Sequence, residues 1–472
     1  MKKQAFNPYL PSWEYIPDGE PHVFGERLYV FGSHDRFNGT LFCQNDYVCW
    51  SAPIDDLGDW RFEGTIYRKA QDPLAKEDSI MQAPDVCQGP DGRFYLYYTL
   101  GLVPVMAVAV CDTPAGQYQY YGLIQYNDGT PVGMREHDLF QFDPGVFRDD
   151  DDRVYLYSGF GPEEDGMFAA ACRKYRMNGA YVMELEPDMR TVKDTPRRIV
   201  PKNGLAAGTG FEEHGFFEAS SMRKIRGKYY FIYSSCLSHE LCWAVSDRPD
   251  GGFQYGGTLV SIGDVGLTDQ PRNYLGNTHG GLVELNGNWY IFYHRQTNRQ
   301  QYSRQGCAER VELDENGRFH QAEITSCGLN GRPLEGVGTY EARIACNLWS
   351  KNGVMAYGHL NTPEAEDHPY FTQTGEDREE NEDQYIANMR DGAVAGFKFF
   401  DLRGLSEIAV DASDADGEFW VHTDLEDKPI CKIPLHTGMK CASLPPVSGV
   451  KPLYFAYHGK GHTNFYTFQI GD

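Results

Sequence analysis

The stretch ASSMRKIRGKYYFIYSS, residues 219–235, contains the pattern that decides the fold. It begins with small and apolar residues, turns at a glycine, and ends in a short strand of aromatic and β-branched residues. Four related stretches occur elsewhere in the chain, with Asp, Gly or Asn in the turn. They are PHVFGERLYVFGS near residue 21, PDVCQGPDGRFYLYYT near residue 84, PGVFRDDDDRVYLYSG near residue 144 and GGLVELNGNWYIFYHR near residue 280.

The spacing of these five copies predicts a β-propeller. Aligned on the tyrosine of the strand, they place Tyr29, Tyr95, Tyr155, Tyr230 and Tyr290 at intervals of 60 to 75 residues. Each interval has room for about four short strands, and units of this size bury their faces against one another as propeller blades. The period-two strands and the Gly/Asp-rich turns exclude a helical solenoid. We therefore expect an all-β fold in which residues 1–327 form a five-bladed propeller.

Composition agrees with many short strands and limits the classes of partner. The chain has 472 residues, enough for two or three domains, with 31 Tyr, 51 Gly and 14% aromatic residues. A net charge of −24 argues against nucleic acid and against an anionic membrane surface, since both require a basic face. No segment approaches the roughly 20 apolar residues of a membrane span.

The cysteines and the N-terminal stretch predict a cytoplasmic protein with free thiols. MKKQAFNPYLPSWEYIPDGE has two lysines but no apolar run of signal-peptide length behind them. Twelve cysteines occur without a CxxC pair, and Cys87, Cys111 and Cys242 lie in strand-like runs, as small buried hydrophobic residues do.

Acidic residues recur at one position just before the copies. Asp143 and Glu218 each precede the tyrosine of their own copy by twelve residues, and Asp18 precedes Tyr29 with a slightly shorter turn. If each copy is the innermost hairpin of a blade, these positions form a ring at one end of the central axis. The remaining two copies have Ala83 followed by Asp85, and Thr278 followed by His279.

Three carboxylates in one pocket suit glycoside hydrolysis. A single Asp before Pro-Gly is commonly a turn residue, but Glu218 is a poor turn former and shares the position. Crowded carboxylates repel one another unless their protonation states are used. Glycosidases need one protonated acid and one ionised carboxylate, and a third carboxylate raises the pKa of the acid. Nearby aromatic residues could stack on a sugar or belong to the core: Trp13, Tyr15, Phe142, Phe216 and Phe217.

These motifs together resemble glycoside hydrolase family 43, over about residues 5–325. The resemblance implies a five-bladed propeller that cleaves β-xylosides and α-L-arabinofuranosides with inversion. It implies that Asp18, in PDGEPHVFGERLYVFGSHD, is the general base and that Asp143, in FDPGVF, modulates the pKa of the acid. The general acid would be Glu218 in FFEASS. His279, in NTHGG, would lie near the axis, and Arg304, in YSRQGCAERVEL, would contact the sugar.

Some details of the sequence leave the substrate open. Glu218 is followed by Ala-Ser-Ser where many members of the family have Gly-Pro-His, and QAPDV lacks the frequent preceding Trp. Asp85 is a rival for the tuning role, two places from the shared position. We expect His279, Arg304, Trp13 and Phe217 to bind the substrate, a short oligosaccharide cleaved from its end.

The propeller pattern stops after about residue 327, and residues 328–340 are Gly-rich and predict a linker. Short strands separated by turns then predict a β-sandwich over residues 340–472. DGAVAGFKFFDL, DGEFWVHTD and LYFAYHGKG resemble a carbohydrate-binding module of the family-6 type. Such modules commonly bind a structural Ca²⁺ ion and sometimes sugar, and we expect the enzyme to require no cofactor. Alternatively, the sandwich only packs on the propeller or closes its pocket. The acidic stretch NTPEAEDHPYFTQTGEDREENEDQY predicts a solvated loop.

Two other functions are compatible with parts of the sequence. A glycoside phosphorylase would need basic residues for phosphate, for which Arg295, Arg299 and Arg304 are candidates, although Asp18 in the position of the base argues against it. A non-catalytic sugar-binding propeller would not need three acids. His279 could also ligate a hydrated cation on the axis, but no ligand cluster requires one. The sequence does not address the oligomeric state.

Overall fold

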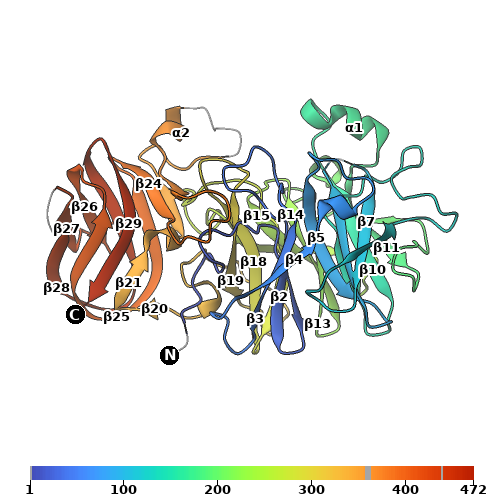
Figure 1. The fold of residues 1–472 in the computed structure, drawn as a ribbon, viewed down its shortest axis with the longest axis horizontal. Helices are drawn as coiled ribbons and strands as arrows, with labels where there is room; N and C mark the ends of the chain where they lie inside the picture. The colour runs from blue at the N-terminus through green and yellow to red at the C-terminus, as the bar shows by residue number, and fades with distance from the viewer. Residues whose placement is uncertain (1–2, 102, 357–362, 437–439, 472) are drawn as a thin grey trace.

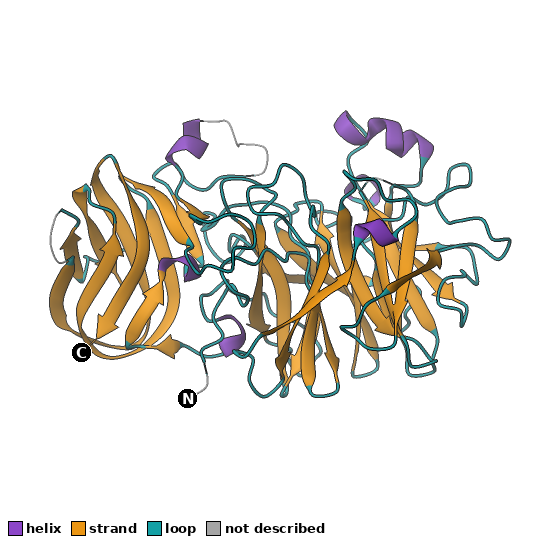
Figure 2. Cartoon of the chain, viewed as in Figure 1, coloured by secondary structure: helices purple, strands orange, loops and turns teal. Residues whose placement is uncertain are grey.

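The computed structural model describes residues 3–101, 103–356, 363–436 and 440–471. It consists almost entirely of strands (Figure 2). The blue-to-yellow part of the chain forms a propeller, and a second domain of long orange and red strands lies beside it (Figure 1). The described helices are two short α-helices, α1 (Ala169–Lys174) and α2 (Pro363–Asp367), and the 3-10 turns η1 (Lys69–Gln71), η2 (Gly166–Phe168), η3 (Asn203–Leu205), η4 (Gly328–Asn330) and η5 (Ala342–Ile344). None of the helices in this part of the chain has the length and hydrophobicity that a transmembrane helix needs.

The prediction of five blades is confirmed. Four antiparallel sheets have four strands each, in sequence order, and the fifth has three strands among the described residues. Blade 1 has β1 (Glu20–Phe24), β2 (Arg27–Phe31), β3 (Tyr47–Pro53) and β4 (Arg61–Tyr67). Blade 2 has β5 (Met81–Gln88), β6 (Phe94–Leu100), β7 (Met106–Cys111) and β8 (Gln119–Leu123). Blade 3 has β9 (Gly145–Arg148), β10 (Val154–Phe160), β11 (Gly179–Leu185) and β12 (Arg197–Pro201). Blade 4 has β13 (Phe216–Ile225), β14 (Lys228–Ser235), β15 (Glu240–Ser246) and β16 (Gln254–Ser261), and blade 5 has β17 (Leu282–Leu285), β18 (Asn288–Gln296) and β19 (Arg304–Val311).

Each repeated stretch is the first hairpin of its blade. The five aligned tyrosines all lie in the second strand of a sheet, which is β2, β6, β10, β14 or β18. The first strands contact one another, β1 with β5, β5 with β9, β9 with β13 and β17 with β1. Arg223 of β13 completes this ring, since its Nε donates to the carbonyl of Leu282 in β17 at 2.6 Å. The innermost strands therefore surround the axis, as the repeat predicts.

The N-terminal segment fastens the last blade to the rest of the ring. The side-chain amide of Asn7 donates to the carbonyl of Ala308 at 2.9 Å and to Glu309 at 2.8 Å, and its own oxygen accepts the amide hydrogen of Ala308. These bonds join the start of the propeller to β19, about 300 residues later in the sequence.

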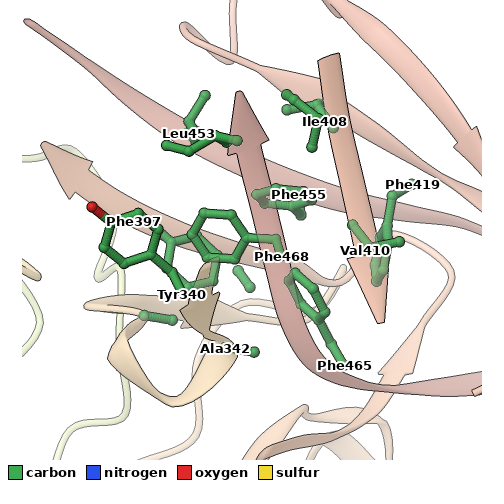
Figure 3. Close-up of a cluster of buried hydrophobic side chains, with 14 of the residues drawn as sticks. Tyr340, Ala342, Phe397, Ile408, Val410, Phe419, Leu453, Phe455, Phe465 and Phe468 are labelled. Carbon is green, nitrogen blue, oxygen red and sulfur yellow. The ribbon is translucent and has the colours of Figure 1, made fainter. Parts of the chain in front are cut away.

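The second domain is consistent with the predicted β-sandwich. Its strands pair in the order β23-β24-β29-β25-β28-β26-β27, with β20 and β22 on β25 and β21 on β29. Phenylalanines from facing strands fill its interior, with Phe397, Phe455, Phe465 and Phe468 in mutual ring contact (Figure 3). The strands are β20 (Leu334–Glu335), β21 (Gly338–Glu341), β22 (Asn347–Trp349), β23 (Tyr370–Thr372), β24 (Tyr385–Arg390), β25 (Val394–Ala412), β26 (Asp416–His422), β27 (Cys431–Pro434), β28 (Cys441–Lys460) and β29 (His462–Gly471).

Candidate active site

The predicted acids lie where the innermost strands of three blades begin. Asp18 precedes β1 and Asp143 precedes β9 by two residues each, and Glu218 is the third residue of β13. The backbone at Asp18 (φ 58°), Ala83 (φ 23°) and Asp143 (φ 44°) has the left-handed conformation that most residues avoid. Because such strain costs about 1–3 kcal/mol per residue, it marks these equivalent positions as specialised.

A β-bulge accompanies Glu218. The pairing of β13 with β14 shifts register on both sides of this residue, and Ala219 after it has φ 70°. Bulges re-aim side chains beside active sites. Blade 3 approaches closely here, because a Cβ on Gly145 would lie 2.4 Å from the carbonyl oxygen of Ser220. Only glycine allows this approach, which brings the blades of Asp143 and Glu218 together.

Asp18 is held as an anion. Its Oδ1 accepts a hydrogen bond from Nη1 of Arg304 at 3.0 Å, and Arg304 also binds Asp35 through Nε at 2.8 Å and Nη2 at 3.0 Å. Burial is the largest single effect and raises the pKa of Asp18, but the Arg304 guanidinium and the neighbouring His294 and His279 together outweigh burial and hold this pKa well below its usual range. Asp18 is therefore ionised at neutral pH.

His294 fixes the backbone of Asp18. Its Nε2 lies 2.8 Å from the carbonyl oxygen of Asn277 and so carries the hydrogen. Burial lowers the pKa of His294, which keeps the ring neutral. Its Nδ1 is then free to accept the amide hydrogen of Asp18 at 3.3 Å.

Glu218 is held as a neutral acid. Burial raises its pKa well above the usual range, and the negative charges of Asp143 and Asp18 raise it further. The pKa of Asp143 is also raised, chiefly by burial, although His279 opposes the shift across 3.5 Å. Burial lowers the pKa of His279, but the hydrogen bond and charge of Asp143 outweigh it and raise this pKa to about 9. Asp18 and Glu218 thus differ in protonation, as an acid–base pair requires.

Of the predicted substrate-binding residues, His279 and Arg304 contact the acids directly. The structure places Trp13 in a hydrophobic cluster, with its ring 5.8 Å from that of Trp50. Phe217, next to Glu218, is half-buried and its ring lies 5.3 Å from Phe160. Neither Trp13 nor Phe217 bonds to an acid in the described part of the chain, so their roles toward the substrate stay predictions.

Asp85 has its own partners away from Glu218. Its Oδ1 lies 2.7 Å from Nε2 of His22, and its Oδ2 accepts the amide hydrogen of Val146 at 2.7 Å. The largest charge effects that raise the pKa of Glu218 come from Asp143 and Asp18.

Few of the described side chains are arranged so that they could ligate the predicted Ca²⁺ ion. Among the described residues, only two groups of three His, Cys, Asp or Glu side chains bring ligand atoms within 4.8 Å of one another, and neither lies in the C-terminal domain. One group contains Cys242, a poor ligand for a hard cation. The other is Glu20, His22 and Asp85: His22 binds Asp85, Asp85 also accepts the amide hydrogen of Val146, and Oε2 of Glu20 accepts from Arg223, while Oε1 of Glu20 has no hydrogen-bond partner among the described residues.

The arginines that a phosphorylase would need are not gathered at the acids. Arg295 donates to the carbonyl of Ala345 at 3.0 Å and stacks on the ring of Phe371, both in the C-terminal domain. Arg299 stacks on Tyr370 of the same domain. Arg304 is neutralised by two carboxylates. The described residues therefore leave no unpaired cluster of arginines for phosphate.

Sequence reasoning missed several residues that support the site. His294 lies at the end of the fifth repeat, where it reads as one more strand residue, and Asp35 follows the first repeat in FGSHD. The prediction of a solvated acidic loop is confirmed in part: residues 373–384 form a loop with exposed Glu376, Glu379, Glu380 and Glu382, whereas residues 363–367 and 370–372 of the same stretch form α2 and β23. Within the loop, Asp377 and Arg378 bind the propeller, Arg378 through Glu14 at 2.7 Å. Only the burial of the Glu14 carboxylate would have indicated that Arg378 binds the propeller, and burial cannot be read from the sequence.

Comparisons with known proteins agree with this geometry. Residues 17–319 match the family described as "Glycosyl hydrolases family 43". A xylosidase/arabinosidase from Thermoclostridium stercorarium is 49% identical, over 100% of this chain and 99% of that protein. A xylosidase/arabinosidase from Bacteroides ovatus is 31% identical, over 61% of this chain and 87% of its own length.

Solved structures share the fold. A family 43 arabinoxylan arabinofuranohydrolase from Bacillus subtilis, in complex with cellotetraose, has a TM-score of 0.52 at 19% identity, over 99% of this chain and 97% of that chain. A family 43 β-xylosidase/α-arabinofuranosidase from a compost metagenome has a TM-score of 0.53 at 24% identity, over 66% of this chain and 96% of its own. With the family match and the full-length relative, the chain belongs to family 43 of the glycosyl hydrolases.

Proposed function

We propose that this chain is an inverting, exo-acting glycoside hydrolase that releases xylose or arabinose from short plant-cell-wall oligosaccharides. The observation that carries the proposal is the opposite protonation of two buried carboxyl groups on one axis. Arg304 keeps Asp18 ionised, whereas burial and neighbouring charges keep Glu218 protonated. This division of roles is what hydrolysis of a glycosidic bond requires.

In the proposed reaction, Asp18 removes a proton from water as the water attacks the anomeric carbon. Glu218 gives its proton to the leaving oxygen, so that the glycosidic bond breaks without releasing an alkoxide. Asp143 and His279 tune the pKa of Glu218 through the charges described above. Inversion requires the two carboxyl groups to lie roughly 6.5–9.5 Å apart, which leaves room for the water.

Limited access to the acids supports attack at a chain end. Asp18, Asp143 and Glu218 are only 5%, 4% and 9% exposed, which suits a narrow pocket better than an open cleft. Two relatives named as xylosidase/arabinosidase support a pentose at this site. The test is a panel of 4-nitrophenyl glycosides, in which β-D-xyloside or α-L-arabinofuranoside should be hydrolysed in preference to hexosides. Turnover of hexosides alone would refute the proposed substrate class.

The stereochemistry has a direct test. Proton NMR of the sugar formed first should show the inverted anomer before mutarotation. Appearance of the retained anomer would refute the single-displacement mechanism even if the sugar were correct.

We also propose that the protein acts in the cytoplasm. All twelve cysteines have free thiols and eight are buried, which suits a reducing compartment. Thiol titration of the unfolded, non-reduced protein should detect nearly all twelve. Several disulfides would contradict a cytoplasmic location.

For the C-terminal domain we propose the limits 340–472, extended toward the N-terminus by β20 and β21, which pair with β25 and β29 within the predicted linker, and a resemblance to carbohydrate-binding modules. Cosedimentation of the Asp18→Asn variant with insoluble xylan tests sugar binding apart from turnover. A domain that only packs on the propeller would leave the protein in the supernatant.

A further inference from the structure

A segment of the C-terminal domain, residues 373–384 (the bracing segment), lies against the first blade of the propeller. Nη1 of Arg378 donates to both carboxylate oxygens of Glu14, at 2.7 and 2.9 Å. The Arg378 guanidinium also lies 5.4 Å from the ring centre of Trp13 and 5.3 Å from that of Phe62. The side chain of Glu14 is fully buried, and Arg378 shares its carboxylate with His34 and Trp50, at 3.0 and 2.8 Å. Arg378 itself has φ 60°, a strained conformation that these contacts maintain.

The neighbouring Asp377 holds a loop of the propeller at two points. Its Oδ1 accepts the amide hydrogen of Phe37 at 2.7 Å, and its Oδ2 accepts a hydrogen from the side-chain amide of Asn45 at 3.1 Å. Both partners belong to residues 34–46 between β2 and β3 (the front loop). The segment also reaches Tyr15, which stacks on Phe37, because the Tyr15 hydroxyl donates to Gln373 at 2.6 Å.

The front loop is connected to Asp18, the proposed general base, through Arg304. Asp35 in this loop binds Arg304, which binds Asp18, and Oδ1 of Asp35 also accepts the amide hydrogen of Cys43 at 2.9 Å. The ring of Phe42 lies 4.8 Å from the Arg304 guanidinium. Phe42 is half-buried and its edge meets Tyr302, with ring centres 4.8 Å apart. The loop thus supplies an aromatic wall beside the arginine that keeps Asp18 ionised.

We propose that the bracing segment is part of the active site, with Asp377 as a positioning residue for the front loop. Asp377 acts through the loop on Phe42, which forms a wall of the subsite for the sugar whose bond is cleaved. This inference rests on the proposed glycosidase function. Because Arg304 keeps three bonds to Asp35 and Asp18 without Asp377, loosening the loop should weaken substrate binding more than it slows the chemical step.

Another contact between the domains provides a matched control. Lys398, which is buried, binds Asp264 at 3.0 Å and Glu323 at 2.8 Å, and neither partner lies in the front loop. Lys398→Met should therefore lower the melting temperature without changing KM. An effect of Asp377 that came only from general loosening of the interface would be reproduced by this variant.

The test uses the full chain and whichever 4-nitrophenyl pentoside the wild type hydrolyses. For Asp377→Ala, KM should rise about tenfold, the loss expected for a charge-assisted hydrogen bond, while kcat stays within about twofold. Asp377→Asn, which keeps an acceptor for the Phe37 amide, should regain part of the loss. Hydrogen exchange measured by mass spectrometry should become faster in peptides covering residues 36–46 of Asp377→Ala.

Three results would overturn the inference. The first is that residues 36–46 of Asp377→Ala exchange hydrogen at the same rate as in the wild type. The second is that they exchange faster while KM does not change. The third is that Lys398→Met raises KM as much as Asp377→Ala does. A wild type that hydrolyses neither pentoside would refute the proposed function instead. In that case the exchange measurement still decides whether Asp377 braces the front loop.

Discussion

Replacing Glu218 by Gln should separate proton donation from every other role of this residue. Gln keeps the size of the side chain and resembles the protonated carboxyl that the raised pKa implies. Among the described residues, none hydrogen-bonds the carboxyl of Glu218, so the substitution breaks no such bond. Loss of a general acid typically costs about 10²–10⁴ in rate, or roughly 3–5 kcal/mol in the barrier. We expect that loss in kcat/KM for xylobiose or an arabinofuranosyl oligosaccharide, whose leaving groups need a proton.

The same variant should lose less than about tenfold on the 4-nitrophenyl glycoside, because nitrophenolate leaves without protonation. It should also be more stable than the wild type above the pKa of an unfolded Glu, near 4.3. The pKa of Glu218 is higher in the folded protein than in the unfolded chain. The wild type therefore loses stability as the pH rises from the pKa of the unfolded state to that of the folded state. Gln does not titrate, so the variant does not lose this stability. Equal losses on both substrates, or a lower melting temperature at neutral pH, would refute the assignment. Asp85→Asn is the matched control, since it removes another buried acid of the propeller that has other partners, and it should leave the ratio of the two substrates unchanged.

Three further variants test the electrostatics of the site. Asp18→Asn should lose about 10²–10⁴ in kcat on activated and natural substrates alike, because no leaving group replaces the base that activates water. A variant that still hydrolysed aryl glycosides but not natural substrates would contradict this. Arg304→Met removes the cation that lowers the pKa of Asp18, so the acidic limb of the kcat/KM profile should move to higher pH, and an unmoved limb would exclude Asp18 as its origin. Asp143→Asn removes a charge that raises the pKa of Glu218, so the basic limb should move to lower pH, although burial still holds it above the usual value; a shift to higher pH would reverse the assigned sign.

Local repetition made the propeller predictable from sequence. The aromatic strand after a tight turn is encoded within about fifteen residues, and five copies of it determine the number of blades. The repeat does not determine how many strands complete each blade, and the fifth sheet has three where about four were expected. The closing contact of Asn7 with β19 spans some 300 residues and has no local signature.

The acids of the site were predictable because they share a position relative to the repeat. The family resemblance implied which acid is protonated, but the cause of that protonation was not predictable, because it depends on Arg304 and on burial, both of which arise only when distant blades meet. The contacts of residues 373–384 with the propeller were missed for a similar reason. A charged stretch is normally solvated, but here Arg378 meets Glu14, a partner more than 360 residues away.

The left-handed backbone at Asp18 and Asp143 limits which residues could replace these acids in relatives that lose catalytic activity. Glycine adopts that conformation without penalty, and asparagine tolerates it better than other residues with a side chain. A duplicated copy freed from selection for catalysis should therefore accept Asn or Gly at these two sites, because either residue keeps the backbone conformation while abolishing acid–base chemistry. Blade 2 retains the conformation with Ala83 in place of an acid. Inactive descendants should accordingly be recognisable by Asn or Gly at positions 18 and 143 within an otherwise intact propeller.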